Sequence, residues 1–345
     1  MPEPADEFIA RGDAFLAQGR YREAIAAYDQ ALGLAPERRS ALNNLGAALR
    51  RLGEDQAALA CFERALVLYC DDVDIMLNFA AALRALGRLD EALGAYESVH
   101  ALSPDDPRAL LGRGDVMLQL DRPADAILAF DRATVLQPES VAAQHRLASA
   151  LRRFGNPGPA LAHFEQAYRL EPKRDFLLGD LILAGRQICD WREAESRLQS
   201  LVEAIAHGEC ASSPFPVLAV LDSPELQRRA AETYSAAIHP GSEGAAPFAR
   251  RAAGARIRIG YFSGDFHNHP VAYLTAELFE LHDRERFEVF GFSLGPPATD
   301  AMRMRLAAAF DHFIDLSRMD DRAAARRARE LGIDIAIDLG GYTEN

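Results

Sequence analysis

The stretch YREAIAAYDQALGLAP, residues 21–36, contains four positions whose residue types recur along the chain. The same types are found again every 34 residues. The alanines are Ala24, Ala58, Ala92, Ala126 and Ala160, the aromatic residues are Tyr28, Phe62, Tyr96, Phe130 and Phe164, and the small residues after them are Ala31, Ala65, Val99, Ala133 and Ala167. The prolines are Pro36, Pro104, Pro138 and Pro172, with Cys70 in the remaining place. Five copies in phase indicate a repeated structural unit.

A 34-residue period with small, aromatic and proline positions in this order predicts tetratricopeptide repeats. A further small position is occupied by Gly12, Gly46, Ala80, Gly114 and Ala148. Each repeat is a pair of antiparallel helices that cannot bury its apolar face alone, so neighbouring pairs must stack into a superhelix. We expect the small residues to allow close helix contact, the aromatic residue to fill space toward the next repeat, and the proline to end the second helix.

The repeats predict the organisation of the first part of the chain. Residues 5–174 hold five repeats. Residues 175–207 form a degenerate sixth unit, in which Trp191 takes the place of Tyr21 but the glycine and the closing proline are missing. Terminal repeats are commonly atypical because they cap the stack. We therefore expect this unit to seal the solenoid.

The sixth position of each repeat faces the inside of such a superhelix, and two repeats carry asparagines there, Asn44 and Asn78. An amide side chain donates and accepts hydrogen bonds at once, so it can pair with both the N–H and the C=O of an extended peptide. We name Asn44 and Asn78 as candidate peptide-binding residues of a groove for protein segments. The alternative left open is that both are solvated helix residues. A repeat array by itself predicts protein binding and no more.

The pattern changes after residue 208. Residues 208–255 contain helical stretches followed by a linker rich in Gly, Pro and Ala. Residues 256–345 alternate between strands, at 257–263, 287–294, 312–317 and 333–341, and helices, at 270–281, 301–310 and 321–331. This order predicts an open parallel sheet with right-handed crossovers. In such sheets ligands bind at the carboxyl ends of the strands.

The first strand of this sheet is followed by SGDFHNHP, residues 263–270. We expect Asp265 and His269 at the carboxyl edge of the sheet, beside the N-terminus of the next helix. An imidazole there can accept a proton or orient a hydroxyl group at neutral pH. The alternatives are that His269 only caps the helix and that Asp265 only caps a turn. Asp338 and Tyr342, at the end of the fourth strand, are candidates to line an acceptor site.

Composition argues against several other classes of protein. The 51 acidic residues outnumber the 38 basic ones, and a net charge of -13 argues against sequence-independent nucleic-acid binding. No basic N-terminal start with an apolar run is present, and no apolar stretch approaches the roughly 18 residues of a membrane span, so we expect a cytoplasmic protein without a membrane segment. The four cysteines form no CxxC pair and indicate reduced thiols, three of them buried. The absence of GxGxxG gives a nicotinamide or flavin cofactor no support.

The motifs together resemble the O-linked N-acetylglucosamine transferase and SPINDLY group of glycosyltransferases. In that group, GY-x-S-x-DF-x-x-H opens the first lobe of a two-lobed GT-B catalytic region. The matching residues here are Gly260, Tyr261, Ser263, Asp265, Phe266, His269 and the following Pro270, and a later GYT is matched by Gly341, Tyr342 and Thr343. The bridging stretch of Arg186 and Ile188 to Trp191 also matches. The resemblance covers nearly the whole chain and implies an α-solenoid of tetratricopeptide repeats followed by a Rossmann-like α/β lobe, part of a GT-B fold.

The resemblance implies transfer of N-acetylglucosamine from UDP-N-acetylglucosamine to Ser or Thr of proteins recruited by the repeats. In the group this reaction proceeds with inversion and without a metal or other cofactor. The histidine that matches His269 lies in the active site there, as a base or as a positioning group. The donor site of the group is built mainly from a second lobe, which this chain lacks, so we expect the 345-residue chain alone to be inactive. Because the group uses both N-acetylglucosamine and fucose, the donor sugar stays open.

Two other classes of function remain alternatives. The first is a non-catalytic adaptor whose repeats bind proteins and whose C-terminal segment is a relic; binding of a UDP-sugar separates it from a transferase. The second is hydrolysis at a metal held by Asp265, His267, His269 and His312. An H-x-H motif in a loop can ligate zinc, but no third ligand falls at the i,i+4 spacing of a helix. We therefore expect no metal.

Overall fold

The computed structural model describes residues 4–238, 255–295, 297–317, 319 and 321–340. The chain separates into two compact units, residues 1–237 and 238–345. Within the described residues, no helix is both long enough and apolar enough to cross a membrane.

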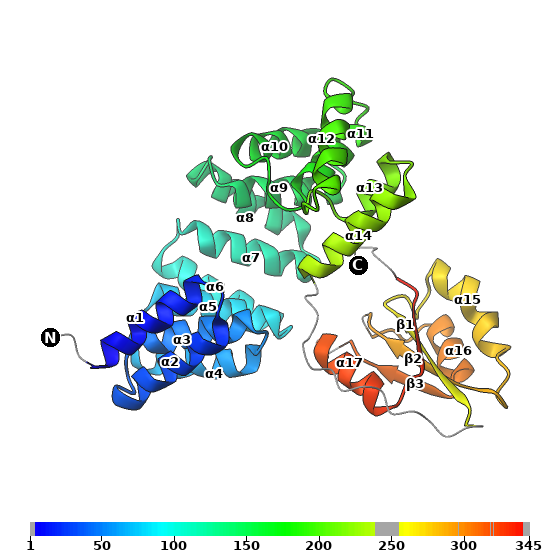
Figure 1. Ribbon diagram of the computed structural model, residues 1–345, viewed down its shortest axis with the longest axis horizontal. Helices are drawn as coiled ribbons and strands as arrows, with labels where there is room; N and C mark the ends of the chain where they lie inside the picture. The colour runs from blue at the N-terminus through cyan, green and yellow to red at the C-terminus, as the bar shows by residue number, and fades with distance from the viewer. Residues whose placement is uncertain (1–3, 239–254, 296, 318, 320, 341–345) are drawn as a thin grey trace. The chain divides into compact units, whose positions relative to one another are not determined.

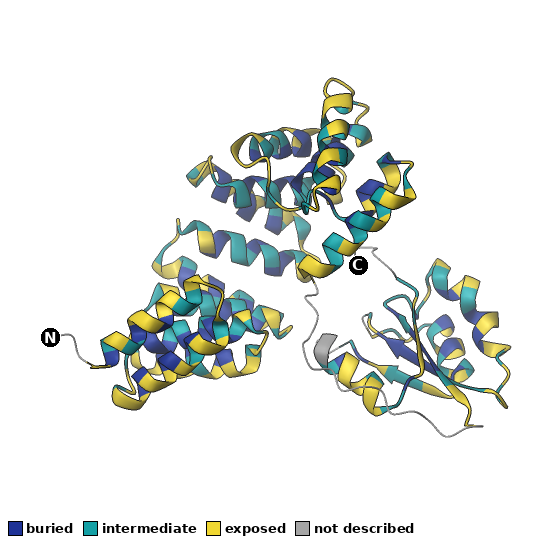
Figure 2. Cartoon of the chain, viewed as in Figure 1, coloured by how far each residue is buried: buried dark blue, intermediate teal, exposed yellow. Residues whose placement is uncertain are grey.

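Ten helices of the first unit form five antiparallel pairs, which confirms the predicted solenoid (Figure 1). The pairs are α1 (Pro4–Ala17) with α2 (Tyr21–Leu34), α3 (Arg39–Arg51) with α4 (Asp55–Leu68), α5 (Val73–Ala85) with α6 (Leu89–Leu102), α7 (Pro107–Gln119) with α8 (Pro123–Leu136), and α9 (Val141–Arg153) with α10 (Pro157–Leu170). The repeated prolines follow the second helix of a pair, as predicted; Pro36, for example, comes two residues after the last residue of α2. Figure 2 shows the buried residues concentrated where helices face one another.

The repeated aromatic residue packs against the small residue of its own repeat. A Cβ atom added at Gly12 would lie 2.5 Å from the ring of Tyr28, which is completely buried. Tyr96 lies against the next repeat instead, because a Cβ atom at Gly112 would meet its ring at 2.3 Å. The prediction that the aromatic residue fills space toward the next repeat is therefore incomplete. The aromatic side chain sits between two layers, and the glycine leaves room for its ring.

The turn between the two helices of a repeat requires a left-handed backbone. Glycine adopts this conformation at no steric cost, whereas other residues adopt it with strain. Glycines occupy the position at Gly19, Gly53, Gly87 and Gly155, with φ between 71° and 86°. The fourth repeat has Asp121 there, at φ 56°, and the sixth unit has Cys189, at φ 58°. The turn geometry is therefore kept in the sixth unit although its sequence is degenerate.

The sixth unit consists of α11 (Leu177–Gln187) and α12 (Ala194–Ala206). Trp191 is 58% exposed, so it does not fill a core position. The segment that leads into α13 (Pro214–Val220) packs onto α11 instead. The N–H of Gly179 donates to the carbonyl of Ala211 at 3.0 Å, and a Cβ atom at Gly179 would meet Oγ of Ser212 at 1.9 Å. The helix α14 (Pro224–Ile238) follows.

All four cysteines are free thiols, as predicted, but the expectation that three are buried is wrong. Cys61 and Cys210 are half-buried, and Cys70 and Cys189 are exposed. The exposed pair lies in turns between helices, where side chains point to solvent because the backbone runs over the surface.

The second unit is a four-stranded parallel sheet in the order β3-β2-β1-β4, which confirms the predicted open α/β lobe. The strands are β1 (Ile257–Ser263), β2 (Phe287–Ser293), β3 (His312–Asp315) and β4 (Ile335–Asp338), and the helices are α15 (Pro270–Glu280), α16 (Ala301–Ala309) and α17 (Asp321–Glu330). One apolar core joins the sheet to α15 and α16, and a second joins it to α17, so both faces are covered.

β3 and β4 end earlier than predicted. The carboxylate of Asp315 accepts the N–H of Ser317 at 2.9 Å, and that of Asp338 accepts the N–H of Gly340 at 2.9 Å. An Asp side chain that bonds the backbone two residues on makes a turn, which removes the chain from the sheet. The two strand ends are thus fixed by aspartates at the carboxyl edge.

Candidate functional site

Polar residues from all four strand ends meet at the carboxyl edge of the sheet. Ser263 of β1 lies in register with Ser293 of β2, and Ser293 lies in register with Asp315 of β3. Asp338 closes β4 beside Phe262. The two serines are buried. This edge is where the predicted site residues of the loop after β1 should lie.

His269 lies at this edge as the N-cap residue of α15. Its Nδ1 accepts a hydrogen bond from the N–H of Val271 at 3.3 Å, and Oδ2 of Asp265 lies 3.5 Å from the same nitrogen. The side chain of His269 is 37% exposed and that of Asp265 is 18% exposed. The structure therefore brings the two predicted residues together, and it also gives His269 the capping role that was the alternative.

The position of the proton follows from these contacts. When Nδ1 accepts from Val271, the neutral ring carries its proton on Nε2, because a neutral imidazole has one donor and one acceptor nitrogen. When the proton is on Nδ1, it faces the carboxylate of Asp265 instead. Nε2 of His269 has no hydrogen-bond partner among the described residues. This nitrogen is free to contact a ligand.

The loop before His269 is held by contacts with both neighbouring strand ends. Oγ of Ser263 accepts the N–H of Asp265 at 2.9 Å. A Cβ atom at Gly295, just after β2, would meet the carbonyl oxygen of Gly264 at 1.9 Å, so the two loops touch. The backbone N–H of Arg303, and after it that of Asn268, hold the pKa of Asp300 below its usual value. Asp300 therefore caps α16 and contacts the loop at once.

Arg303 is a site residue that the sequence analysis missed. Its guanidinium donates to the carbonyl of Phe266 at 3.3 Å, to Oγ of Ser293, and to Oδ2 of Asp315 at 3.3 Å. The side chain is only 11% exposed. It thus joins the ends of β2 and β3 to the loop that carries His269. An arginine in the first turn of a helix opposes the helix dipole, and this was the available signal.

Of the remaining candidates, Tyr342 lies outside the described residues. The metal alternative is not supported, because His312 lies at the amino end of β3, on the opposite edge from His269, where Nε2 contacts Oε1 of Glu288 at 3.0 Å. Across the described parts of the chain, no group of three or more His, Cys, Asp or Glu side chains is placed to hold a metal ion.

The candidate groove residues Asn44 and Asn78 are tied to neighbouring repeats. Nδ2 of Asn44 donates to Oδ1 of Asp13 at 2.9 Å, and Nδ2 of Asn78 donates to Oδ1 of Asn43 at 2.9 Å. Asn43 in turn donates to Oδ1 of Asn44 at 3.4 Å. A chain of hydrogen bonds thus connects the first helices of three repeats. Asn78 uses one donor within the protein, whereas Asn44 both donates and accepts, so each amide keeps only part of its hydrogen-bonding capacity.

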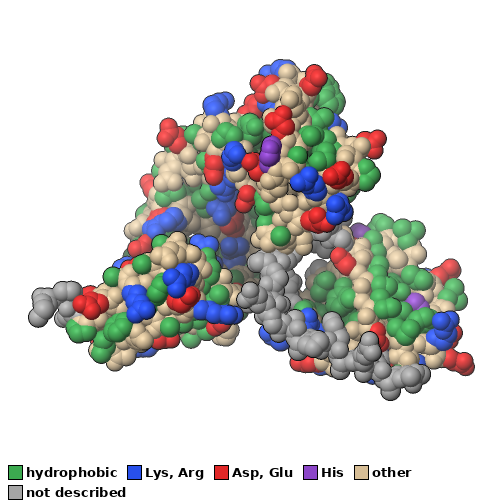
Figure 3. All heavy atoms as spheres, in the orientation of Figure 1, with side chains coloured by type: hydrophobic (Ala, Val, Ile, Leu, Met, Phe, Trp, Pro, Cys, Tyr) green, Lys and Arg blue, Asp and Glu red, His purple; other side chains and the backbone are tan. Residues whose placement is uncertain are grey.

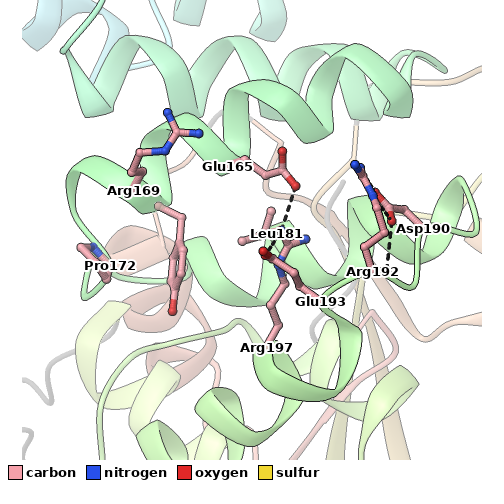
Figure 4. A pocket seen from close by; sticks show the side chains of 9 residues that line it. Glu165, Arg169, Pro172, Leu181, Asp190, Arg192, Glu193 and Arg197 are labelled. Carbon is pink, nitrogen blue, oxygen red and sulfur yellow. Dashed lines mark hydrogen bonds and ion pairs between the residues drawn. The ribbon is translucent and has the colours of Figure 1, made fainter.

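A cavity of about 470 Å³ lies between α10, α12 and the turn after α11 (Figure 4). Arg197 points toward Glu165 and Glu193, at 2.8 and 2.7 Å. Arg192 binds Asp190 and lowers the pKa of that carboxyl to about 2. Arg192 and Arg197 are therefore paired with carboxylates of this cavity, and the contact of Arg197 with Glu165 joins the sixth unit to the fifth repeat.

Comparison with known proteins finds a family model that matches each part of the chain. Residues 239–345 match the model of glycosyl transferase family 41, and residues 9–72, 77–141 and 118–175 match a tetratricopeptide repeat model. A probable UDP-N-acetylglucosamine--peptide N-acetylglucosaminyltransferase SEC of Arabidopsis thaliana is 32% identical over 173 residues, which cover 46% of this chain and 18% of that protein. A UDP-N-acetylglucosamine--peptide N-acetylglucosaminyltransferase of Caenorhabditis elegans is 33% identical over 172 residues, 46% of this chain and 15% of that protein.

The chain thus spans less than a fifth of the length of these curated relatives. Among solved structures, a tetratricopeptide repeat protein from Parabacteroides merdae matches with a TM-score of 0.50 and 22% identity, over 70% of this chain and 94% of that one. This likeness concerns the solenoid fold alone. The resemblance inferred from the motifs is confirmed by the two family models and by the relatives.

Proposed function

We propose that this chain, in which tetratricopeptide repeats precede a segment of glycosyl transferase family 41, is part of a protein O-glycosyltransferase. The reaction proposed is transfer of N-acetylglucosamine from UDP-N-acetylglucosamine to Ser or Thr hydroxyls, with inversion and without a metal. The observation that carries the proposal is the free Nε2 of His269 at the carboxyl edge of a family 41 sheet. Four free cysteines, two of them exposed, fit a reducing compartment such as the cytoplasm.

His269 is proposed to contact the reacting groups through Nε2. The hydrogen bond from Val271 to Nδ1 favours the tautomer with its proton on Nε2, and that N–H can donate to an oxygen of the substrate. In this tautomer the residue orients the substrate or stabilises charge that develops on it. Base action through the same nitrogen would need the other tautomer, whose Nδ1–H faces Asp265. Asp265 therefore supports the ring and can stabilise the tautomer with its proton on Nδ1.

Arg303 is proposed as a positioning residue for this site. It contacts the carbonyl of Phe266, which lies three residues before His269 in the same loop. Its other contacts are Ser293 and Asp315, on two neighbouring strand ends. Because these groups are rigid parts of the sheet, the guanidinium limits how far the loop can move.

The solenoid is proposed to recruit the acceptor protein. The unused hydrogen-bonding capacity of Asn44 and Asn78 suits the backbone of an extended segment. The relatives from Arabidopsis thaliana and Caenorhabditis elegans are named as transferases that act on peptides, which supports a polypeptide as the acceptor. The nucleotide sugar is proposed as donor substrate, not as a bound cofactor.

The test is sugar transfer by the natural protein that contains these residues. Purified protein is given UDP-N-acetylglucosamine labelled in the sugar, with a Ser/Thr-containing acceptor, in the presence and absence of EDTA. Label in the acceptor that EDTA does not reduce is the expected result. The 345-residue chain, predicted above to be inactive by itself, is assayed beside it. GDP-fucose serves as the competing donor.

Each outcome separates the alternatives. Transfer from GDP-fucose alone would contradict the proposed donor. Absence of transfer from either donor, together with acceptor binding by the repeats, would favour the non-catalytic adaptor. A requirement for a metal that EDTA removes would contradict the metal-free mechanism.

A further inference from the structure

We propose that the inner face of repeats two to five binds an acidic segment of the acceptor protein through Arg50, Arg84 and Arg146. The inference rests on the proposed function, because it assigns a chemical class of acceptor to the groove that recruits it. Arg50 lies on α3, Arg84 on α5 and Arg146 on α9.

The three arginines belong to the helices that form the inner layer of the solenoid. Each odd-numbered helix from α1 to α11 contacts the next odd-numbered helix as well as its partner. In a curved stack of helix pairs, the helices that approach one another across repeats line the concave surface. Arg50 and Arg84 occupy the same position of successive repeats, and Arg146 takes the repeat position of Asn44 and Asn78. Figure 3 shows Lys and Arg side chains gathered in the hollow of the solenoid.

The arginines share few acidic partners. Nε of Arg146 contacts Oδ1 of Asp115 at 3.1 Å, and Arg84 acts on the same carboxylate. Nε of Arg50 is 3.8 Å from Oδ1 of Asp55, beyond hydrogen-bond distance. The cluster therefore carries more positive than negative charge. In the cavity of Figure 4, by contrast, Arg192 and Arg197 each have a carboxylate within hydrogen-bond distance.

Two of the arginines also have unsatisfied donors. Nε of Arg50 and Nε of Arg84 are shielded from solvent and have no hydrogen-bond partner among the described residues. Burial lowers the pKa of Arg50; the charge of Asp55 partly opposes this effect, and the nearby charge of Arg84 adds to it. Like charges held in a partly desolvated recess are unfavourable, and a carboxylate entering between them relieves both effects. An anionic side chain is the group that this part of the groove lacks.

A polypeptide fits the surroundings better than a nucleic acid. Asn44 and Asn78, with amides suited to a peptide backbone, lie on α3 and α5, the same two helices as Arg50 and Arg84. The chain as a whole carries a net charge of -13, which repels a long polyanion. A short run of Asp or Glu in an extended segment supplies carboxylates without a continuous phosphate backbone.

The experiment measures peptide binding by the full 345-residue chain. Fluorescein-labelled Ser/Thr-containing peptides differ only at a short run of Asp and Glu, replaced by Asn and Gln in the neutral version. Fluorescence anisotropy gives Kd at low and at physiological ionic strength. The acidic peptide is expected to bind about tenfold more tightly than the neutral one, since a charge-assisted hydrogen bond in a recess is worth that much. The difference shrinks as salt is added.

Variants assign the effect to the cluster. Arg84→Gln and Arg146→Gln should each weaken binding of the acidic peptide about tenfold and leave the Kd of the neutral peptide nearly unchanged. Arg84→Lys, which keeps the charge, should restore part of the loss. Arg132→Gln is the matched control, because Arg132 is an exposed arginine of α8 that pairs with Asp105. Circular dichroism verifies that each variant is folded.

The outcomes that overturn the inference are distinct from those that overturn the proposed function. Equal affinity for acidic and neutral peptides, or no effect of Arg84→Gln and Arg146→Gln, contradicts the arginine site but leaves the recruiting groove intact. Binding of neither peptide contradicts the groove itself. Tighter binding of a single-stranded RNA, lost in the same variants, would identify a nucleic acid as the occupant and overturn the inference.

Discussion

Nδ1 of His269 lies 3.5 Å from Oδ2 of Asp265 and 3.3 Å from the amide nitrogen of Val271, so one ring nitrogen faces both an acceptor and a donor. It can serve only one of them in a given protonation state. The contact to Val271 meets hydrogen-bond geometry, whereas the contact to Asp265 is longer. The hydrogen bond from Val271 favours the tautomer with its proton on Nε2, in which this nitrogen donates a hydrogen bond to a ligand.

The substitution Asp265→Asn, made in the natural protein, distinguishes His269 acting as a hydrogen-bond donor from His269 acting as a base. With a donating Nε2–H held by Val271, kcat should change by less than about tenfold, because the tautomer does not depend on the carboxylate. Nitrogen NMR of the His269 ring should show the proton on Nε2 in both proteins. A loss of about a hundredfold or more would show that His269 acts as a base through the tautomer that Asp265 supports.

Gly114→Ala should destabilise the solenoid. A Cβ atom there would lie 2.4 Å from the ring of Phe130, which is completely buried, so the ring or the helix must shift at a cost of about 1–3 kcal/mol in the free energy of unfolding. Gly94→Ala is the control, because nothing lies within 4 Å of its added Cβ. That change should stabilise α6 by about 0.5–1 kcal/mol through helix propensity. Urea unfolding followed by circular dichroism measures the free energy of unfolding of both variants. Equal changes in the two variants would contradict the packing of Gly114 against Phe130.

Arg303→Gln should loosen the carboxyl edge of the sheet. It removes charged hydrogen bonds to Phe266, Ser293 and Asp315 from a largely buried side chain, at a cost of about 2 kcal/mol. Hydrogen exchange should accelerate at the loop before His269. Arg305→Gln, in the same helix, removes only an exposed pair with Glu280 and should leave exchange in that loop unchanged. Unaltered exchange in both variants would contradict the positioning role of Arg303.

The half-buried His163 predicts a pH dependence of stability. Burial lowers its pKa below 6.5, and Nδ1 contacts Oε1 of Gln144 at 2.7 Å. Since the unfolded chain then binds more protons than the folded one below pH 6.5, the free energy of unfolding falls as pH drops from 6.5 toward the lower folded-state pKa. At pH values well above 6.5, where the ring is neutral in both the folded and the unfolded chain, this residue contributes no slope. Urea midpoints of His163→Gln should fall less over that window; identical falls in both proteins would contradict the assignment.

Periodicity in the sequence predicted most of the fold. The 34-residue spacing places Tyr28 and its equivalents in the core, and the alternation after residue 256 predicts the parallel sheet. The ends of β3 and β4 were missed because the alternation of polar and apolar residues continues past Asp315 and Asp338, to Leu316 and Leu339. Such local hydrogen bonds compete with the sheet and become visible only with coordinates.

The site was predicted less completely than the fold. The loop after β1 was found because a parallel sheet fixes which strand ends share an edge. Arg303 was missed because its partners, such as Phe266 and Asp315, are distant in sequence or on other elements. The arginine cluster was missed for the same reason, since Arg84, Asp115 and Arg146 come together only when the repeats stack. Tyr342, outside the described residues, stays a prediction.

The rate of sugar transfer from labelled UDP-N-acetylglucosamine, measured for the natural protein and for its His269→Ala and His267→Ala variants, tests both the proposed function and the proposed site. His267 lies in the same loop with its ring edge-on to that of His269, the two centroids being 5.7 Å apart, so its variant controls for the loss of packing in the loop. We expect label on Ser or Thr of the acceptor, a rate lowered about a hundredfold or more by His269→Ala, and a nearly unchanged rate in His267→Ala. Transfer that survives His269→Ala at the wild-type rate would contradict the proposed site, and no transfer by the wild-type protein would contradict the proposed function.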